Sequence, residues 1–189
     1  MILSPARIVL VRHGQSTYNA HGRLQGQTDT PLSDAGRAEA EALRPFLPRF
    51  EQVVTSDLQR ASETAALLGY PDARPDARWR EIDLGGWAGR LVSEFPDEQQ
   101  GAWRGGPLHA DDGESWRQFL ARVGGALDEL AQRGGEWLVV CHGGAIRAAL
   151  SHVTGADPRT VIGPANTSVT VLRPPFLEQY AWTPRSSAM

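Results

Sequence analysis

The sequence predicts an α/β fold with a mostly parallel central sheet. Three short runs, at 8–11, 53–55 and 137–140, consist of β-branched or other apolar residues and have the composition of strands. Each run leads into a polar or glycine-containing turn, and then into apolar residues at helical spacing. Alternating strands and helices are typical of parallel sheets, whose ligands bind outside the carboxyl ends of the strands. A length of 189 residues is that of one domain, so we expect a single domain over 1–189.

Composition excludes several classes of protein. The chain is 41% hydrophobic and 22% charged, and its net charge of −3 gives no electrostatic basis for binding nucleic acid or an anionic membrane. The single cysteine excludes an internal disulfide, and all 19 basic residues are arginine, which excludes lysine-based catalysis. No apolar run approaches the ~20 residues of a membrane span, and the first residues lack a signal-peptide pattern. We therefore expect a cytoplasmic protein with no nucleic-acid or membrane partner.

Helices are predicted after the first two strands. Ser33 can cap the first helix, because its hydroxyl can accept an N–H of the first turn. The predicted inner face of this helix consists of Ala35, Ala38, Ala42 and Phe46. Asp57 is the expected cap of the second helix, which ends at Gly69. The predicted inner face of the second helix consists of Ala61, Ala65 and Leu68.

Two further helices and a hairpin are predicted in the second half. A helix between 115 and 133 carries a clear apolar stripe, and its Gly124-Gly125 pair predicts close packing against a neighbour. Another helix follows the strand at 137–140. Residues 168–172 and 179–182 are expected to pair as a terminal hairpin. Its exposed edge could pair with a second copy, so a homodimer is one option for this chain.

Arg12 and His13 come directly after the run at 8–11, where a strand would leave the core. Arginine offers a planar fork of donors that matches phosphate, and histidine can act as base, acid or nucleophile near neutral pH. Gly14 would let the backbone approach a ligand. Further polar or small positions that could face the same anion are Asn19, Gln25 and Gly26. An isolated Arg-His pair is, however, more often a hydrogen-bonded loop histidine beside a surface charge.

Three later features of the sequence favour an anion site at Arg12 and His13 over this interpretation. His142 and Gly143 follow the strand at 137–140, so a second histidine-glycine turn opens a helix. Arg60 lies in the first turn of its predicted helix, where a cation is unfavourable unless an anion binds there. Two carboxylates, Glu81 and Asp83, lie beside aromatic and glycine residues, and a carboxyl in such an apolar pocket could serve as a general acid. On spacing alone, Arg60 could equally be a solvated arginine, and carboxylates placed like Glu81 and Asp83 are more often solvated loop charges.

The motifs together resemble the histidine phosphatase superfamily, in its phosphoglycerate-mutase-like branch (branch 1). The stretch 10–19 is similar to the RHG signature, and 56–64 matches S-x-L-x-R-A-x-x-T. The stretch 81–89 resembles E-x-x-x-G-x-W-E-G, although Ala88 replaces the usual acid. The resemblance runs from about 7 to about 172 and implies a three-layer α/β/α sandwich.

The resemblance also implies a mechanism. His13 would attack phosphorus and become phosphorylated, and Glu81 would protonate the leaving alcohol and then activate water. Its implied catalytic residues are Arg12, His13, Arg60, Glu81 and His142, and its implied substrate-binding residues are Asn19, Gln25, Gly26 and Gly143. The expected activity is hydrolysis of a small phosphorylated metabolite without metal or cofactor. Residues 90–113 are the expected loop-rich cap, where His109, Asp111 and Asp112 could touch substrate.

Four alternatives remain open. A cofactor-dependent phosphoglycerate mutase shares these residues, but resembling mutases carry a longer basic segment after the proton donor, whereas only Arg90 and Arg104 precede residue 113 here. Cys141 to Arg147 spells C-x5-R, the loop of cysteine-dependent phosphatases, although we expect Cys141 to be buried and inert. A zinc site is disfavoured because the five histidines lack ligand spacing. A non-catalytic binder of phosphorylated ligands would need neither His13 nor Glu81.

Overall fold

The computed structural model describes residues 5–96, 105–106 and 109–184. Its six-stranded sheet has the order β3-β2-β4-β1-β5-β6. The strands are β1 (Arg7–Arg12), β2 (Gln52–Thr55), β3 (Arg74–Pro75), β4 (Glu136–Cys141), β5 (Val169–Arg173) and β6 (Phe176–Trp182). The first four strands pair in parallel, and β5 and β6 are antiparallel to their neighbours. The predicted mostly parallel α/β fold is therefore confirmed.

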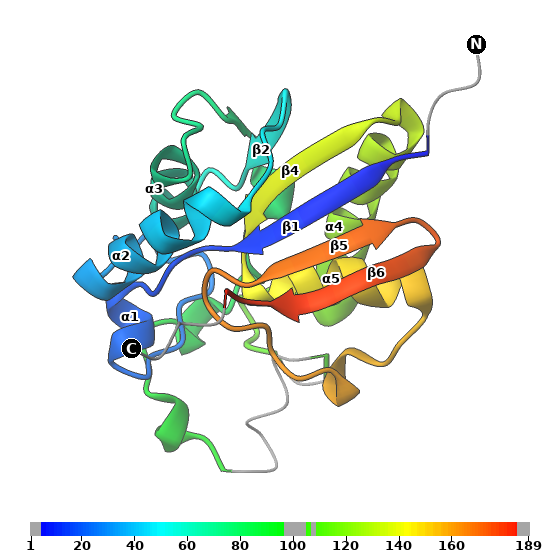
Figure 1. Ribbon diagram of the computed structural model, residues 1–189. Helices are drawn as coiled ribbons and strands as arrows, with labels where there is room; N and C mark the ends of the chain where they lie inside the picture. Colours follow the sequence, from blue (N-terminus) through cyan, green and yellow to red (C-terminus); the bar gives the residue numbers. More distant parts are fainter. Residues whose placement is uncertain (1–4, 97–104, 107–108, 185–189) are drawn as a thin grey trace.

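Helices cover both faces of the sheet. The α-helices are α1 (Thr17–Ala20), α2 (Asp34–Leu43), α3 (Gln59–Leu67), α4 (Trp116–Arg133) and α5 (Gly143–Thr154). Short 3-10 turns lie at Arg44–Phe46, Ala77–Trp79, Gly85–Trp87, Val92–Glu94 and Pro158–Thr160. Figure 1 shows α2 and α3 on one side of the sheet and α4 and α5 on the other. Over the described part of the chain, no helix is long and apolar enough to cross a membrane.

Two apolar clusters hold the three layers together. Along β1, Ile8 and Leu10 point into the cluster beneath α4 and α5, whereas Val9 and Val11 point into the cluster beneath α3. Successive side chains of a strand face opposite sides, so both faces of β1 are buried. This burial explains why the run at 8–11 is continuously apolar rather than alternating.

Helix α2 forms as predicted but buries the opposite face. Its cap is Ser33, whose hydroxyl accepts the N–H of Gly36 at 3.1 Å. The residues predicted to face inward, Ala35, Ala38, Ala42 and Phe46, are all exposed, and the buried ones are Gly36, Ala40 and Leu43. The reason lies in the packing of Gly36, where an added Cβ would lie 2.0 Å from the carbonyl oxygen of Gln15. Alanine spacing could not reveal a face that is selected by glycine-to-backbone contact.

Helix α3 forms as predicted, but Asp57 does not cap it. Leu58 occupies the N-cap position and makes no side-chain cap hydrogen bond. The Asp57 carboxylate instead forms an ion pair with Arg80, with Nε and Nη2 at 2.7 and 2.6 Å. The predicted inner face is confirmed, since Ala61, Ala65 and Leu68 are buried.

Helix α4 packs along α5 through the predicted apolar stripe. This contact explains Gly124 but not Gly125. A Cβ added at Gly124 would lie 2.6 Å from the ring of His152, whereas one added at Gly125 would meet nothing within 4 Å. The predicted terminal hairpin is confirmed by β5 and β6, and β6 is longer than expected.

Candidate active site

The candidate site lies at the carboxyl ends of β1 and β4. Arg12 is the register partner of Cys141, so His13 and His142 leave neighbouring strands at the same edge. Their ring centroids are 5.1 Å apart. Arg60 reaches this edge from the first turn of α3. Residues far apart in the sequence are therefore assembled by the parallel register of the sheet.

A cleft of about 480 Å³ opens at this edge. Every predicted site residue except His142 lines it: Arg12, His13, Asn19, Gln25, Gly26, Arg60, Glu81 and Gly143. His142 is fully buried behind His13. The structure thus brings the predicted residues together in one place.

His13 lines the cleft, and a hydrogen bond engages one of its two ring nitrogens. Its Nδ1 donates to the carbonyl of Gly14 at 2.7 Å, so the unprotonated nitrogen of the neutral ring is Nε2. Burial lowers the pKa of His13 well below 6.5, and the charges of Arg60 and Arg12 lower it further. A neutral imidazole with a free Nε2 can attack phosphorus.

Two arginines flank His13, of which Arg60 is buried and Arg12 is half-buried. Arg60 is 0% exposed, and its two terminal nitrogens donate to the carbonyls of Thr28 and Gly26, both at 2.8 Å. Arg12 donates through Nη1 to the carbonyl of Pro164 at 2.6 Å. Burial lowers the pKa of Arg60 to about 10, which leaves the guanidinium protonated at neutral pH. The Nε atoms of Arg12 and Arg60 are buried and have no hydrogen-bond partner among the described residues, so oxygens of a bound phosphoryl group could satisfy them.

His142 is oriented by a residue that the sequence reasoning missed. Its Nε2 lies 2.8 Å from the hydroxyl of Ser56. If that hydroxyl donates, the neutral ring carries its proton on Nδ1, which is buried and has no partner within the described chain. Burial lowers the pKa of His142 well below 6.5, with Arg60 as the next cause. Ser56 is the first residue of the S-x-L-x-R motif, and its place in that motif is the sequence feature that could have identified it.

The Glu81 carboxylate is fixed by backbone donors. Its Oε2 accepts the N–H of Gly144 and its Oε1 accepts the N–H of Ile82, both at 2.9 Å. A Cβ added at Gly144 would lie 2.0 Å from Oε1 of Glu81. Gly144 therefore has to be glycine for the carboxylate to reach the start of α5.

Arg122 of α4 supports the loop that carries Glu81. It donates to the carbonyls of Arg78, Arg80 and Glu81 at 2.9, 3.1 and 3.3 Å. Its other partner is the Glu114 carboxylate, which lies 2.6 Å from Nη2. Sequence reasoning gave Arg122 no role, because no local pattern links it to residues forty positions earlier.

Hydrogen bonds fix the orientation of the Gln25 and Asn19 side chains in the cleft. The Gln25 side-chain oxygen accepts hydrogen bonds from the hydroxyls of Ser16 and Thr30 at 2.8 and 2.9 Å. Because these bonds fix the orientation of the amide, its NH₂ group is the part that can donate to a ligand in the cleft. The Asn19 side-chain oxygen accepts the Ser16 N–H at 3.2 Å. Asn166, which the sequence reasoning missed, donates to the His13 carbonyl at 2.9 Å.

Gly14 corrects a sequence-based expectation. An added Cβ would lie 2.3 Å from the carbonyl oxygen of Gly36, so Gly14 packs against α2, and it is not among the described residues that line the cleft. Its N–H donates to the Thr64 hydroxyl at 3.1 Å. Gly14 is needed because the turn after β1 packs tightly on the start of α2.

The predicted cap is only partly described. Residues 97–104 and 107–108 lie outside the described residues, while Val92 lines the cleft. His109, Asp111 and Asp112 are exposed and are not among the lining residues. Asp112 accepts the Gly86 N–H at 2.9 Å, so its contact is with the neighbouring loop.

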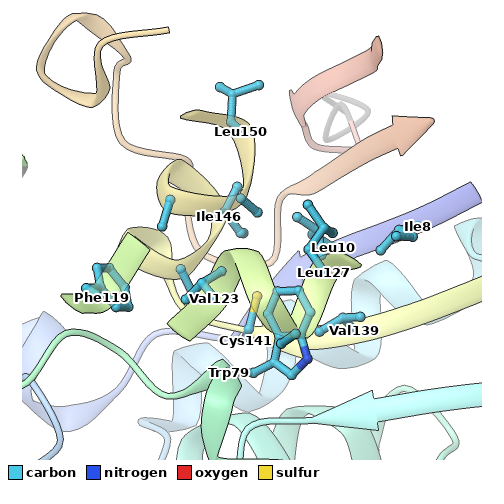
Figure 2. Packing of buried hydrophobic residues seen from close by; sticks show 14 of the residues in the cluster. Ile8, Leu10, Trp79, Phe119, Val123, Leu127, Val139, Cys141, Ile146 and Leu150 are labelled. Atoms are coloured by element: carbon cyan, nitrogen blue, oxygen red, sulfur yellow. The ribbon is translucent and has the colours of Figure 1, made fainter. Parts of the chain in front are cut away.

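Cys141 points away from the cleft. Figure 2 shows its sulfur among Val123, Val139 and Trp79, within the apolar cluster beneath α4 and α5. The side chain is fully buried, and desolvation raises the pKa of its thiol above its usual range. A thiol cannot act as a nucleophile from this position, so the expectation of a buried Cys141 is confirmed. In the described residues, no three His, Cys, Asp or Glu side chains are grouped to hold a metal ion.

Comparison with known proteins agrees with this geometry. A family model described as the histidine phosphatase superfamily (branch 1) matches residues 8–179. Glucosyl-3-phosphoglycerate phosphatase of Mycobacterium tuberculosis is 36% identical over 188 aligned positions, which cover 88% of this chain and 84% of that protein. Metal-independent phosphoserine phosphatase of Arabidopsis thaliana is 32% identical over 181 positions, which cover 88% and 76%.

Solved structures give the same assignment. The structure of mycobacterial glucosyl-3-phosphoglycerate phosphatase with VO3 has a TM-score of 0.78 at 34% identity, and the match covers 87% of this chain and 91% of that one. A phosphoglycerate mutase from Thermus thermophilus has a TM-score of 0.76 at 34% identity, with coverage of 88% and 92%. The chain therefore belongs to the histidine phosphatase superfamily, branch 1.

Proposed function

We propose that the protein is a metal-independent phosphatase that hydrolyses small phosphomonoesters through a phosphohistidine at His13. The observation that carries this proposal is a neutral His13 that lines the cleft together with Arg12 and Arg60, while its Nδ1 is engaged by the Gly14 carbonyl and its Nε2 is left unprotonated. Phosphoryl transfer depends chiefly on positioning and charge stabilisation, which two arginines can supply to the equatorial oxygens. The relatives named as phosphatases make glucosyl-3-phosphoglycerate and phosphoserine the first substrates to test.

The reaction proceeds in two steps. Nε2 of His13 bonds to phosphorus as the P–O bond to the alcohol breaks, and the Glu81 carboxyl gives its proton to the leaving oxygen. Water then attacks the phosphohistidine and gives a proton to the Glu81 carboxylate as the P–N bond breaks. Phosphate leaves, and both side chains return to their starting states. Arg12, Arg60 and His142 stabilise the charge on the phosphoryl oxygens in both steps.

The test is hydrolysis of p-nitrophenyl phosphate in the presence of EDTA by wild type and His13→Ala. Wild-type turnover that falls by about 10³-fold or more in His13→Ala supports the mechanism. Alkaline quenching and intact-mass measurement should detect a phosphate adduct on wild type only. Full activity in His13→Ala would reject His13 as the nucleophile.

A phosphoglycerate mutase is the second candidate, because relatives with that name match this chain over most of its length. The same His13 and Glu81 would serve both reactions. Incubation with 3-phosphoglycerate separates the two, since a phosphatase releases phosphate faster than it forms 2-phosphoglycerate. The opposite order of rates would favour the mutase.

Three broader expectations belong to the same proposal. The chain is one catalytic domain with a substrate-facing cap around 90–113, and it works in the cytoplasm.

A homodimer would form through the edge of β6, where Phe176, Leu177 and Trp182 are exposed. Light scattering after size-exclusion chromatography tests this assembly, and a monomer at micromolar concentration would reject it.

A further inference from the structure

The peptide that joins His13 to Gly14 is held on both sides by side chains from distant elements. The His13 carbonyl accepts a hydrogen bond from the Asn166 side-chain amide at 2.9 Å. The Gly14 N–H donates to the hydroxyl of Thr64 at 3.1 Å. Because the C=O and N–H of a trans peptide point in opposite directions, these two bonds fix the rotation of the peptide plane. Neither Asn166 nor Thr64 is among the described residues that line the cleft.

The orientation of this peptide decides where the ring of His13 finds its own hydrogen-bond partner. The Gly14 carbonyl, which belongs to the next peptide, accepts the Nδ1–H of His13 at 2.7 Å. That bond leaves Nε2 as the unprotonated nitrogen and restricts rotation of the ring. The bonds to Asn166 and Thr64 therefore act on the nucleophile through the backbone, without contact with the phosphoryl group.

Thr64 links the nucleophile to the helix that carries Arg60. Its side chain is fully buried in α3, and its hydroxyl donates to the carbonyl of Arg60 at 2.7 Å. Because the hydroxyl proton is engaged there, a lone pair of the same oxygen is free to accept the Gly14 N–H. One helix thus places Arg60 at the cleft and also holds the backbone beside His13.

Asn166 is brought to His13 by a strained turn. The next residue, Thr167, has a φ of 53°, a left-handed conformation that is an outlier for a β-branched side chain. Its N–H donates to the Arg12 carbonyl at 3.1 Å, and the Asn166 amide also donates to Oδ1 of Asn19 at 3.3 Å. Strain of this kind persists only where surrounding contacts determine the backbone, and it concentrates at functional sites. The strained turn therefore places the Asn166 amide where it holds the end of β1.

We infer that Asn166 and Thr64 are positioning residues for the nucleophile, which hold the His13–Gly14 peptide so that Nε2 of His13 stays aligned with the phosphorus atom. The inference rests on the proposed phosphatase function and adds two residues to the group that supports it. A displacement of about 1 Å at a reacting group can lower a rate by about 10²-fold. Loss of either bond should therefore slow phosphoryl transfer to His13 while the arginines of the cleft stay in place.

The test compares vanadate with inorganic phosphate as inhibitors of p-nitrophenyl phosphate hydrolysis by wild type, Asn166→Ala and Thr64→Val. Vanadate can form a bond to Nε2 of His13 and so resembles the transition state, whereas phosphate binds without that bond. We expect kcat/KM to fall, and the inhibition constant of vanadate to rise, by at least about tenfold in each variant. The inhibition constant of phosphate should stay within about threefold of wild type, because Arg12 and Arg60 still bind the anion.

Ser151→Ala is the matched control. The Ser151 hydroxyl donates to the carbonyl of Ala156 at 2.8 Å, so this change also removes a half-buried side-chain donor to the backbone, at a residue outside the described cleft lining. It should leave kcat/KM and both inhibition constants unchanged. Thr64→Val nearly preserves the shape of the buried side chain and leaves the contact between Asn166 and Asn19 in place. It therefore tests the inference even if Asn166→Ala does not fold.

Each outcome decides the inference. Equal weakening of vanadate and phosphate inhibition would show that the two residues maintain the anion pocket and would overturn the positioning role. A lower kcat with both inhibition constants unchanged would indicate a smaller folded fraction and would overturn it as well, as would wild-type kcat/KM in either folded variant. Absence of hydrolysis by wild type, or full activity in His13→Ala, rejects the phosphohistidine mechanism itself and is seen without these variants.

Discussion

Gly144 shows how one missing side chain can place a catalytic group. Because a Cβ at this position would lie 2.0 Å from Oε1 of Glu81, Gly144→Ala should displace the carboxylate. We expect kcat on an alkyl phosphate to fall by about 10²-fold or more, since protonation of the leaving oxygen is lost. Gly125→Ala is the matched control, because nothing lies within 4 Å of that site. The control should keep its activity and gain up to about 1 kcal/mol in free energy of unfolding. Normal kcat in Gly144→Ala would contradict the role of Glu81.

Substitution of Cys141, the alternative nucleophile, gives a second test of the histidine mechanism. Its side chain is buried in an apolar cluster and contributes to packing, not to the lining of the cleft. We expect Cys141→Ala to retain most of the activity on p-nitrophenyl phosphate while losing about 1 kcal/mol in free energy of unfolding. Parallel activity and urea-unfolding measurements check this. A folded Cys141→Ala protein as inactive as His13→Ala would overturn the histidine mechanism.

At the scale of elements, α4 supports the loop that delivers Glu81. Arg122 joins the two by donating to three carbonyls of residues 78–81 while pairing with Glu114. Arg122→Met keeps a long side chain over the Phe119 ring, whose centroid lies 5.0 Å from the guanidinium carbon, but removes these donors. The expected result is a larger loss of kcat on alkyl phosphates than on p-nitrophenyl phosphate, whose leaving group needs less protonation.

A matched variant separates this positioning role from general destabilisation. Arg117 is exposed on the same helix, so Arg117→Met controls for loss of an arginine from α4. If Arg122 acts through Glu81, adding Arg122→Met to Glu81→Gln should cost little further activity. Equal losses on both leaving groups, or full additivity in the double variant, would show that Arg122 only stabilises the fold.

At the scale of the whole molecule, two buried neutral histidines make stability depend on pH. Burial lowers the pKa of His13 and of His142 in the folded protein, whereas the unfolded chain titrates near 6.5. Below about pH 6.5 the unfolded state therefore binds protons that the folded state does not, and stability falls as the pH falls. Each histidine contributes a slope of at most about 1.4 kcal/mol per pH unit.

Urea unfolding between pH 5 and pH 7.5 measures this slope. His142→Gln should flatten it, because one of the two buried rings no longer titrates in the unfolded chain. His109→Gln removes an exposed histidine and controls for the substitution itself. A slope of the same size in wild type and His142→Gln would contradict the assignment.

The sequence by itself determined the class of fold, the order of its main strands and helices, and the residue types that meet at the cleft. These are local properties: β-branched runs, helical spacing and short motifs such as Arg12-His13-Gly14 can be recognised without knowing what packs against them. The family and the phosphatase class predicted from those motifs are confirmed by the comparisons.

Only the tertiary structure decided which face of α2 is buried, why Gly144 is glycine, and what orients His142 and the Glu81 loop. Each of these depends on contacts between distant parts of the chain, such as Ser56 with His142 or Arg122 with Glu81. The physical reason is that a local pattern sets backbone preference and the tendency to be buried, while the partner of each side chain is chosen by how the layers pack. The cluster of arginines in the cleft is likewise a property of the assembled sheet and its helices.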